Sequence, residues 1–399
     1  MTTFEATGIV REKTAQAVDV LKAQDLDLWL TFVRETTQVK DPVVDLLLGF
    51  HLTWPSALLI SRSGECIAIV GRYDVPNVER LEAYTQVLGY DQSIQPQLVE
   101  ALERLKPRRI GVNYSENDPA ADGLTYGMFR LLSRMLAATP YSSRLVSAER
   151  LIGSLRGCKT ASELALIRAA IERTEDAFQH LTRLLRPGVS DMELADFLHS
   201  YATEHGCGSA WEWEYCPVVT VGPESDVGHA MPSGLRARAG NLVQVDFGLE
   251  RYGFVSDLQR TWYLRKPGEQ VAPQAVQRAW EAARAALEAG RAVLKPGAQG
   301  WEVDAAARST LVAAGYPEYL HAFGHHIGRT AHDGATVLGP KWERYGEAIN
   351  GVVQEGNVFA IELGISVPEY GYIGCEENVV VTATGAEYLS HPQLDLWLI

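Results

Sequence analysis

The stretch that decides the fold lies between residues 242 and 261: Leu242-Val-Gln-Val-Asp-Phe-Gly-Leu249, the turn Glu250-Arg-Tyr-Gly253, and Phe254-Val-Ser-Asp-Leu-Gln-Arg-Thr261. Two apolar runs around a turn predict a β-hairpin. If Leu249 faces Phe254, Asp246 lies directly opposite Asp257, with Cβ atoms about 5 Å apart. Like charges so placed repel, and Asp is a poor strand former. The pair therefore indicates a bound cation; the alternative is a solvated edge hairpin.

A second pair of carboxylates occurs near the C-terminus. Glu362 lies inside the apolar run 358–365, where a buried Glu needs a partner. Glu376 and Glu377 open a second apolar run, and the two-residue period of a strand points them to opposite faces. Only one of them can face a site. By symmetry with the first hairpin, we expect each half to contribute one carboxylate pair.

Histidines cluster between these two stretches. Four of the ten in the chain fall within twelve residues: His321, His325, His326 and His332. Imidazole suits borderline transition metals. One nitrogen ligand among four carboxylates describes a Mn, Co, Fe or Zn site better than a Ca or Mg site. His229 stands alone on a turn-rich segment before the first hairpin, and the residues alone leave its role open.

The second part of the chain repeats an arrangement of helices. The capping boxes Thr160-Ala-Ser-Glu163 and Ser190-Asp-Met-Glu193 open two helices that Leu185-Arg-Pro-Gly188 separates. About 109 residues later, helices over 273–293 and 301–314 flank Leu294-Lys-Pro-Gly297. A β-rich stretch follows each copy, over 242–264 and 358–382. This predicts one domain of two related halves, unless Leu-basic-Pro-Gly is only a common helix ending.

The first part of the chain reads as an alternating α/β unit. Short apolar runs predict strands over 28–33, 57–60, 66–70 and 110–112, with helices over 78–88 and 97–105. The turn Ser61-Arg-Ser-Gly64 predicts a hairpin. We therefore expect an α/β domain over residues 1–154 and a second domain over residues 155–399.

Composition excludes several classes of protein. The 399 residues carry 36 basic and 50 acidic side chains, a formal net charge of −14, which disfavours nucleic acid. No apolar run approaches the ~18 residues of a membrane span. The first fourteen residues lack the apolar segment of a secretion signal. Five scattered cysteines without a Cys-x-x-Cys pair fit a reducing compartment, so we expect a cytoplasmic protein.

Three well-known catalytic motifs do not apply to this sequence: one lacks its usual context and two are absent. Asp246-Phe-Gly248 spells the kinase metal-binding triplet, but the other kinase motifs do not precede it. No His-Glu-x-x-His sequence exists, and no Ser or Cys sits in a Gly-x-Ser-x-Gly elbow. A kinase and a nucleophile-based hydrolase are therefore disfavoured.

Taken together, these motifs resemble those of the M24 metallopeptidases, the group of methionine aminopeptidase, aminopeptidase P and prolidase. The resemblance implies an α+β fold: a pita-bread catalytic domain of two pseudo-symmetric halves over residues 155–399, preceded by a creatinase-type α/β domain. Methionine aminopeptidases generally lack that extra domain, so the prolidase and aminopeptidase P branch is the better match. The resemblance to this family also implies a homodimer.

Carried over position by position, the resemblance implies five metal ligands: Asp246, Asp257, His325, Glu362 and Glu376. Asp257 and Glu376 would bridge two divalent ions of Mn, Co or Zn. Asp246 would bind one ion, and His325 and Glu362 would bind the other. Creatinase, a metal-free relative, is disfavoured because all five positions are intact.

The same resemblance implies hydrolysis of the Xaa-Pro bond in dipeptides or short peptides by a hydroxide that two metals share. Glu362 would transfer the proton, while His229 and His332 would contact the substrate. Aminopeptidase P activity on longer peptides is the alternative within the class. A pita-bread binding protein without catalysis is the alternative from another class.

Several positions depart from the prolidase pattern. Gly374 stands where prolidases usually have Arg, two residues before the last Glu ligand. Leu363 replaces a common Pro, and Arg329 takes a position that is usually apolar. These changes leave the metal ligands intact but leave recognition of a dipeptide carboxylate open; Arg329 or another basic residue is a candidate for it.

Overall fold

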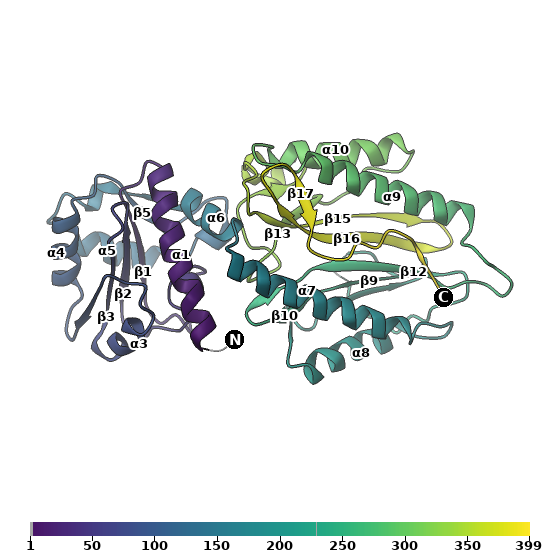
Figure 1. The fold of residues 1–399 in the computed structure, drawn as a ribbon, viewed down its shortest axis with the longest axis horizontal. Helices are drawn as coiled ribbons and strands as arrows, with labels where there is room; N and C mark the ends of the chain where they lie inside the picture. The colour runs from purple at the N-terminus through teal and green to yellow at the C-terminus, as the bar shows by residue number, and fades with distance from the viewer. Residues whose placement is uncertain (1–2, 229) are drawn as a thin grey trace. The chain divides into compact units, whose positions relative to one another are not determined.

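The computed structural model describes residues 3–228 and 230–399 of the chain (Figure 1). Two compact units make up the chain, Met1–Arg156 and Gly157–Ile399. Each unit has its own sheet and its own buried apolar clusters. Among the described residues, no helix has both the length and the apolar character that a bilayer crossing requires.

A six-stranded sheet forms the centre of the N-terminal unit, in the order β4-β3-β2-β1-β5-β6. The strands are β1 (Leu28–Val33), β2 (Ser56–Ser61), β3 (Cys66–Gly71), β4 (Gln86–Tyr90), β5 (Ile110–Val112) and β6 (Leu145–Ser147). Alternate residues of β1 enter different cores: Trp29 packs with α1 (Thr3–Ala23), and Leu30 packs with α4 (Gln95–Leu105) and α5 (Tyr126–Met135). Burial on both faces explains why these strands are apolar throughout. The four strands predicted here are confirmed.

The helix predicted over residues 78–88 is wrong. A short helix, α3 (Val75–Glu79), ends where the prediction began, and Glu82 adopts a left-handed φ of 53°. Residues 86–90 instead form β4, which pairs in parallel with β3. Pairing at the sheet edge therefore overrides the local helical spacing.

The C-terminal unit is built on a large sheet in the order β14-β13-β15-β16-β12-β9-β8. Its strands are β8 (Val218–Val221), β9 (Leu242–Phe247), β12 (Leu258–Tyr263), β13 (Gly324–His326), β14 (Val337–Leu338), β15 (Val358–Val367) and β16 (Gly371–Val381). β17 (Ala386–Tyr388) pairs with β16, and β18 (Trp397–Leu398) pairs with β12. A small second sheet contains β7 (Gly208–Ser209), β10 (Leu249–Arg251) and β11 (Phe254–Val255).

Four helices accompany this sheet: α7 (Ala161–Thr182), α8 (Asp191–Glu204), α9 (Gln274–Val293) and α10 (Gly300–Ala313). The two predicted capping boxes form at Thr160 and Ser190, where each hydroxyl accepts a hydrogen bond from the N–H of the Glu three residues on. A third box, Gln299 with Glu302, opens α10. All four predicted helices are confirmed.

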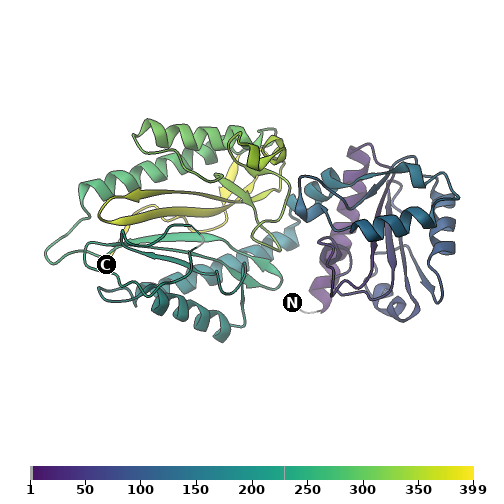
Figure 2. The same ribbon diagram turned by 180° about the vertical axis from the view of Figure 1, so that it is seen from behind.

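The unit consists of two related halves, as the repeat predicted. In one half, Phe178 of α7 packs on Phe247 and Trp262 of the β9–β12 hairpin. In the other, α9 packs on the β15–β16 hairpin. The halves join where β12 pairs with β16, and each hairpin lies beside its own helix pair (Figures 1 and 2).

The predicted register of the first hairpin is wrong by two residues. Tyr252 and Gly253 alone form the turn, with φ of 57° and 77°, so Arg251 pairs with Phe254. Asp246 therefore faces Gln259 rather than Asp257. A two-residue shift keeps the same face of a strand, and both aspartates still line one cavity.

We predict that Ser190→Ala lowers the free energy of unfolding of the C-terminal unit by about 1 kcal/mol, because the N–H of Glu193 loses its hydroxyl acceptor. Urea unfolding followed by far-UV circular dichroism measures the change. The exposed Ser200 on the same helix gives the control Ser200→Ala. Equal midpoints for the two variants would contradict the role of the cap.

Candidate metal centre

A cavity of about 470 Å³ opens in the C-terminal unit and collects most of the predicted site residues. All five predicted ligands and His332 line it: Asp246, Asp257, His325, His332, Glu362 and Glu376. Aromatic residues and two glutamines make up much of the remaining wall: Trp211, Tyr215, Gln244, Gln259, Tyr319 and Tyr372.

Three of the four carboxylates lie in one row across the sheet. Asp246 pairs with Gln259, Gln259 with Glu376, and Glu376 with Glu362. The neighbours Ile361 and Leu363 pack against α9, so alternation turns Glu362 to the cavity. Glu377 points the other way, as predicted, to Arg260 at 3.3 Å. Glu362 and Glu376 therefore lie directly opposite each other on β15 and β16.

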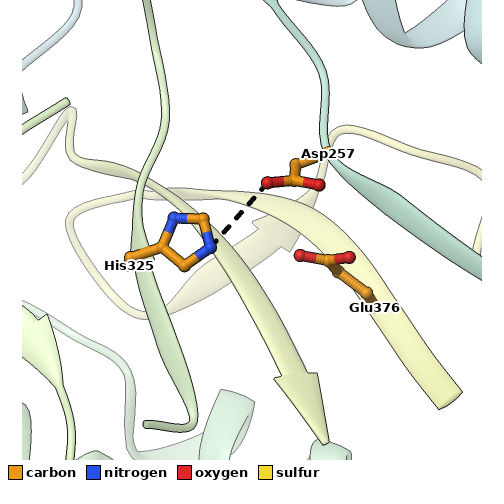
Figure 3. Close-up of side chains that lie close together, drawn as sticks. All are labelled: Asp257, His325 and Glu376. Atoms are coloured by element: carbon orange, nitrogen blue, oxygen red, sulfur yellow. Dashed lines mark ion pairs between the residues drawn. The ribbon is translucent and has the colours of Figure 1, made fainter. Parts of the chain in front are cut away.

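Asp257, His325 and Glu376 come together most closely. Each offers one ligand atom, and these atoms all lie within 4.8 Å of one another (Figure 3). Nε2 of His325 is 3.8 Å from Oδ2 of Asp257. The buried Asn378 holds the backbone of Asp257 in place: its Oδ1 accepts from the N–H at 3.1 Å, and its Nδ2 donates to the C=O at 2.6 Å.

Burial and like charge shape the electrostatics of the site. Burial raises the pKa of Asp246, Asp257 and Glu376 well above the ordinary range, and the neighbouring carboxylates raise these pKa values further. Burial lowers the pKa of His325, which favours the neutral imidazole. The site thus offers a neutral nitrogen and several carboxylates that repel one another.

The residues fit divalent cations. Within the described residues, Oδ1 of Asp246 and Oε2 of Glu376 are buried and receive no hydrogen bond. Buried carboxylate oxygens require a positive partner. Oxygen and imidazole donors together suit Mn, Co or Zn, and two divalent ions would offset the charge of the four carboxylates.

The other histidines divide between the cavity and the core. The ring of His332 lies edge-on to that of His325, with centroids 4.4 Å apart. His321 also lines the cavity, whereas the buried His326 stacks on Phe359 and has a pKa lowered to about 3 by burial. The predicted substrate contact His229 lies outside the described residues.

Two features of the site lacked a clear signal in the sequence. Oε2 of Glu362 accepts hydrogen bonds from Gln259 at 3.1 Å and from Tyr319 at 3.3 Å. Residue type alone did not single out these neutral side chains.

Arg329, a candidate for carboxylate recognition, instead lies over the ring of Phe254 at 4.7 Å and is absent from the described cavity lining.

Comparison with known proteins shows the family to which the chain belongs. A sequence model of metallopeptidase family M24 matches residues 165–383. The chain belongs to family M24. It is 28% identical over 311 residues to the Xaa-Pro dipeptidase of Lactobacillus delbrueckii subsp. lactis, covering 78% of this chain and 79% of that one.

A further relative and a solved structure extend the comparison. The Xaa-Pro dipeptidase of Pyrococcus furiosus is 28% identical over 252 residues, 61% of this chain and 66% of that one. The solved structure of the Xaa-Pro dipeptidase from Bacillus anthracis superposes with a TM-score of 0.73 at 23% identity, covering 98% of this chain and all of that one. The expected pita-bread fold is thereby confirmed, and the chain is a metallopeptidase.

We predict that Mn²⁺ raises the melting temperature of the metal-stripped protein, and by more at pH 7.5 than at pH 5.5. Raised pKa values keep protons on the carboxyls, and a cation must displace them. Without metal, the native state keeps protons on these buried groups that the unfolded state releases, so the free energy of unfolding falls as pH rises above about 4. At a hundredfold excess over Kd, binding stabilises by about 2.7 kcal/mol. Differential scanning calorimetry measures the rise.

Two variants provide the comparison. Asp257→Asn removes a central ligand charge and is expected to abolish most of the Mn²⁺-dependent rise. Glu387→Gln changes an exposed carboxylate on β17 and is expected to leave the rise intact. An undiminished rise in Asp257→Asn would contradict this assignment of the metal centre.

Proposed function

We propose that the protein hydrolyses the peptide bond before proline in short peptides. The convergence of four carboxylates and His325 on one cavity is the observation that carries this proposal. Relatives named Xaa-Pro dipeptidase support the choice of bond.

We propose two divalent cations, with Mn, Co and Zn as candidates. The residues that would hold them are Asp246, Asp257, His325, Glu362 and Glu376. Bound there, the cations would polarise the scissile carbonyl and activate a water molecule.

Side chains of this chain would handle the protons. Glu362 accepts the proton of the attacking water and later donates it to the leaving nitrogen. The hydrogen bonds from Gln259 and Tyr319 to Oε2 of Glu362 fix the orientation of its carboxylate. His332 orients the substrate beside His325, and we assign the same task to His229.

The walls of the cavity suit a proline-containing peptide. Proline lacks an N–H and has a fixed φ, so clefts that bind extended backbone reject it. Trp211, Tyr215, Tyr319 and Tyr372 supply apolar ring surface for a pyrrolidine. A volume of about 470 Å³ lies in the range of small-molecule sites and can hold a short peptide.

One observation favours peptides that continue beyond the proline. Lys and Arg are absent from the cavity lining in the described part of the chain, whereas Glu212 adds a further carboxylate. The free carboxylate of an Xaa-Pro dipeptide would find no lining cation there, but a peptide bond at the same place is neutral. Aminopeptidase P activity is therefore the second candidate function.

A peptide panel tests both candidates. We expect the metal-loaded protein to cleave Xaa-Pro-Yaa-Zaa and Xaa-Pro-amide with higher kcat/KM than Xaa-Pro. Xaa-Pro carries its carboxylate on the proline itself, whereas the tetrapeptide carries it two residues farther on and the amide carries none. Mn²⁺, Co²⁺ and Zn²⁺ are added separately to stripped protein. A preference for Xaa-Pro over its amide would favour the dipeptidase, and failure to cleave any member would contradict the proposed function.

We predict that Glu362→Gln lowers kcat by about 10²–10⁴-fold, because an amide cannot accept the proton of the attacking water. Steady-state kinetics on the best panel peptide measures the loss. Glu387→Gln is the matched control and should retain full activity, since it lies on the edge strand β17 and is exposed. Wild-type kcat in Glu362→Gln would overturn its role.

A further inference from the structure

Gln259 occupies the centre of the carboxylate row. On β12 it pairs with Asp246 of β9 on one side and with Glu376 of β16 on the other. Its side chain is 6% exposed and lines the same cavity as its neighbours. A neutral residue thus stands between the carboxylates of the two halves.

A directed chain of hydrogen bonds orients this side chain. The Thr220 hydroxyl donates to Oε1 of Gln244 at 3.2 Å, and Nε2 of Gln244 donates to Oε1 of Gln259 at 3.1 Å. Nε2 of Gln259 then donates to Oε2 of Glu362 at 3.1 Å. Because each amide oxygen receives a donor, the amide nitrogen of Gln244 is turned toward Gln259, and that of Gln259 is turned toward Glu362.

Gly374 leaves the space that this arrangement needs. A Cβ at position 374 would lie 2.1 Å from Oε1 of Gln259 and 3.1 Å from Nε2 of Gln244. Any larger residue there would push the amide of Gln259 aside. Gln244 of β9, Gln259 of β12 and Gly374 of β16 therefore depend on one another for this arrangement.

We propose that Gln259, supported by Gln244 and given room by Gly374, is the positioning residue for Glu362. This inference rests on the proposed function, in which Glu362 binds metal and transfers the proton. The amide fixes one carboxylate oxygen without adding charge. A Lys or Arg at the same place would fix it too, but would offset part of the negative charge that binds the cations.

The first test replaces the donor while keeping the volume. We expect Gln259→Met to lower kcat by about 10–100-fold, the usual effect of removing a hydrogen bond to a metal ligand, and to leave KM within about twofold. The visible absorption spectrum of the Co²⁺-loaded protein should also change, because the Glu362 carboxylate is free to reorient. Thermal melting shows whether the variant is folded.

A second variant displaces the side chain of Gln259 without replacing the residue. We expect Gly374→Ala to reduce kcat and alter the Co²⁺ spectrum in the same direction, since the new methyl group displaces only the end of a flexible side chain. Gly385→Ala is the matched control, because a Cβ there meets nothing within 4 Å. It should behave as wild type.

A double-mutant cycle separates positioning from general damage. In a Gln259→Ala background, Gly374→Ala should cost no further activity, because the amide that it displaces is already gone. Losses that multiply in the double variant would overturn the proposal. So would a wild-type kcat and Co²⁺ spectrum in Gln259→Met.

The Co²⁺ spectra also test the positioning of Glu362 separately from peptide hydrolysis. They use Co²⁺ and no substrate, so they report on Glu362 even if the wild type cleaves no Xaa-Pro peptide. An altered spectrum in both Gln259→Met and Gly374→Ala would then support the positioning role alone. Unchanged spectra would reject it, whatever the peptide panel shows.

Discussion

Repulsion among carboxylates is the constraint around which the C-terminal unit is organised. Asp246, Glu376 and Glu362 lie in one row on three strands of one sheet, and Asp257 lines the same cavity. Without a positive partner, this burial destabilises the fold, as the raised pKa values of three of these groups indicate. Cations bound at this place would relieve the repulsion and would thereby couple metal binding to the folding of this unit.

The two-half architecture explains how so many acids reach one place. Each hairpin buries one face against its own helix pair and turns the other to the cavity, so each hairpin needs to contribute only two acids. β12 and β16 then bring the faces together at Gln259 and Glu376. Neutral donors complete the site: Asn378 holds the backbone of Asp257, and Gln259 with Tyr319 holds Glu362.

Much of this arrangement could be predicted from the sequence, for identifiable reasons. Charged residues inside apolar strands are costly, so Asp246 and Glu362 stood out, and capping boxes marked α7 and α8. The predicted register of the first hairpin was wrong because its turn consists of Tyr252 and Gly253 alone. Tyr319 and Gln259 escaped notice because a neutral side chain acquires its role only through the folded sheet. The β4 strand was missed because its pairing with β3 is a tertiary effect.

Divalent cations on the acidic row of this cavity would be visible by anomalous diffraction from crystals of the Mn²⁺-loaded protein. We expect two strong anomalous peaks about 2.0–2.6 Å from oxygens of Asp246, Asp257, Glu362 and Glu376, and one of these peaks also at that distance from Nε2 of His325. Crystals with Mn²⁺ bound elsewhere and no anomalous peak in this cavity would contradict the proposed metal centre.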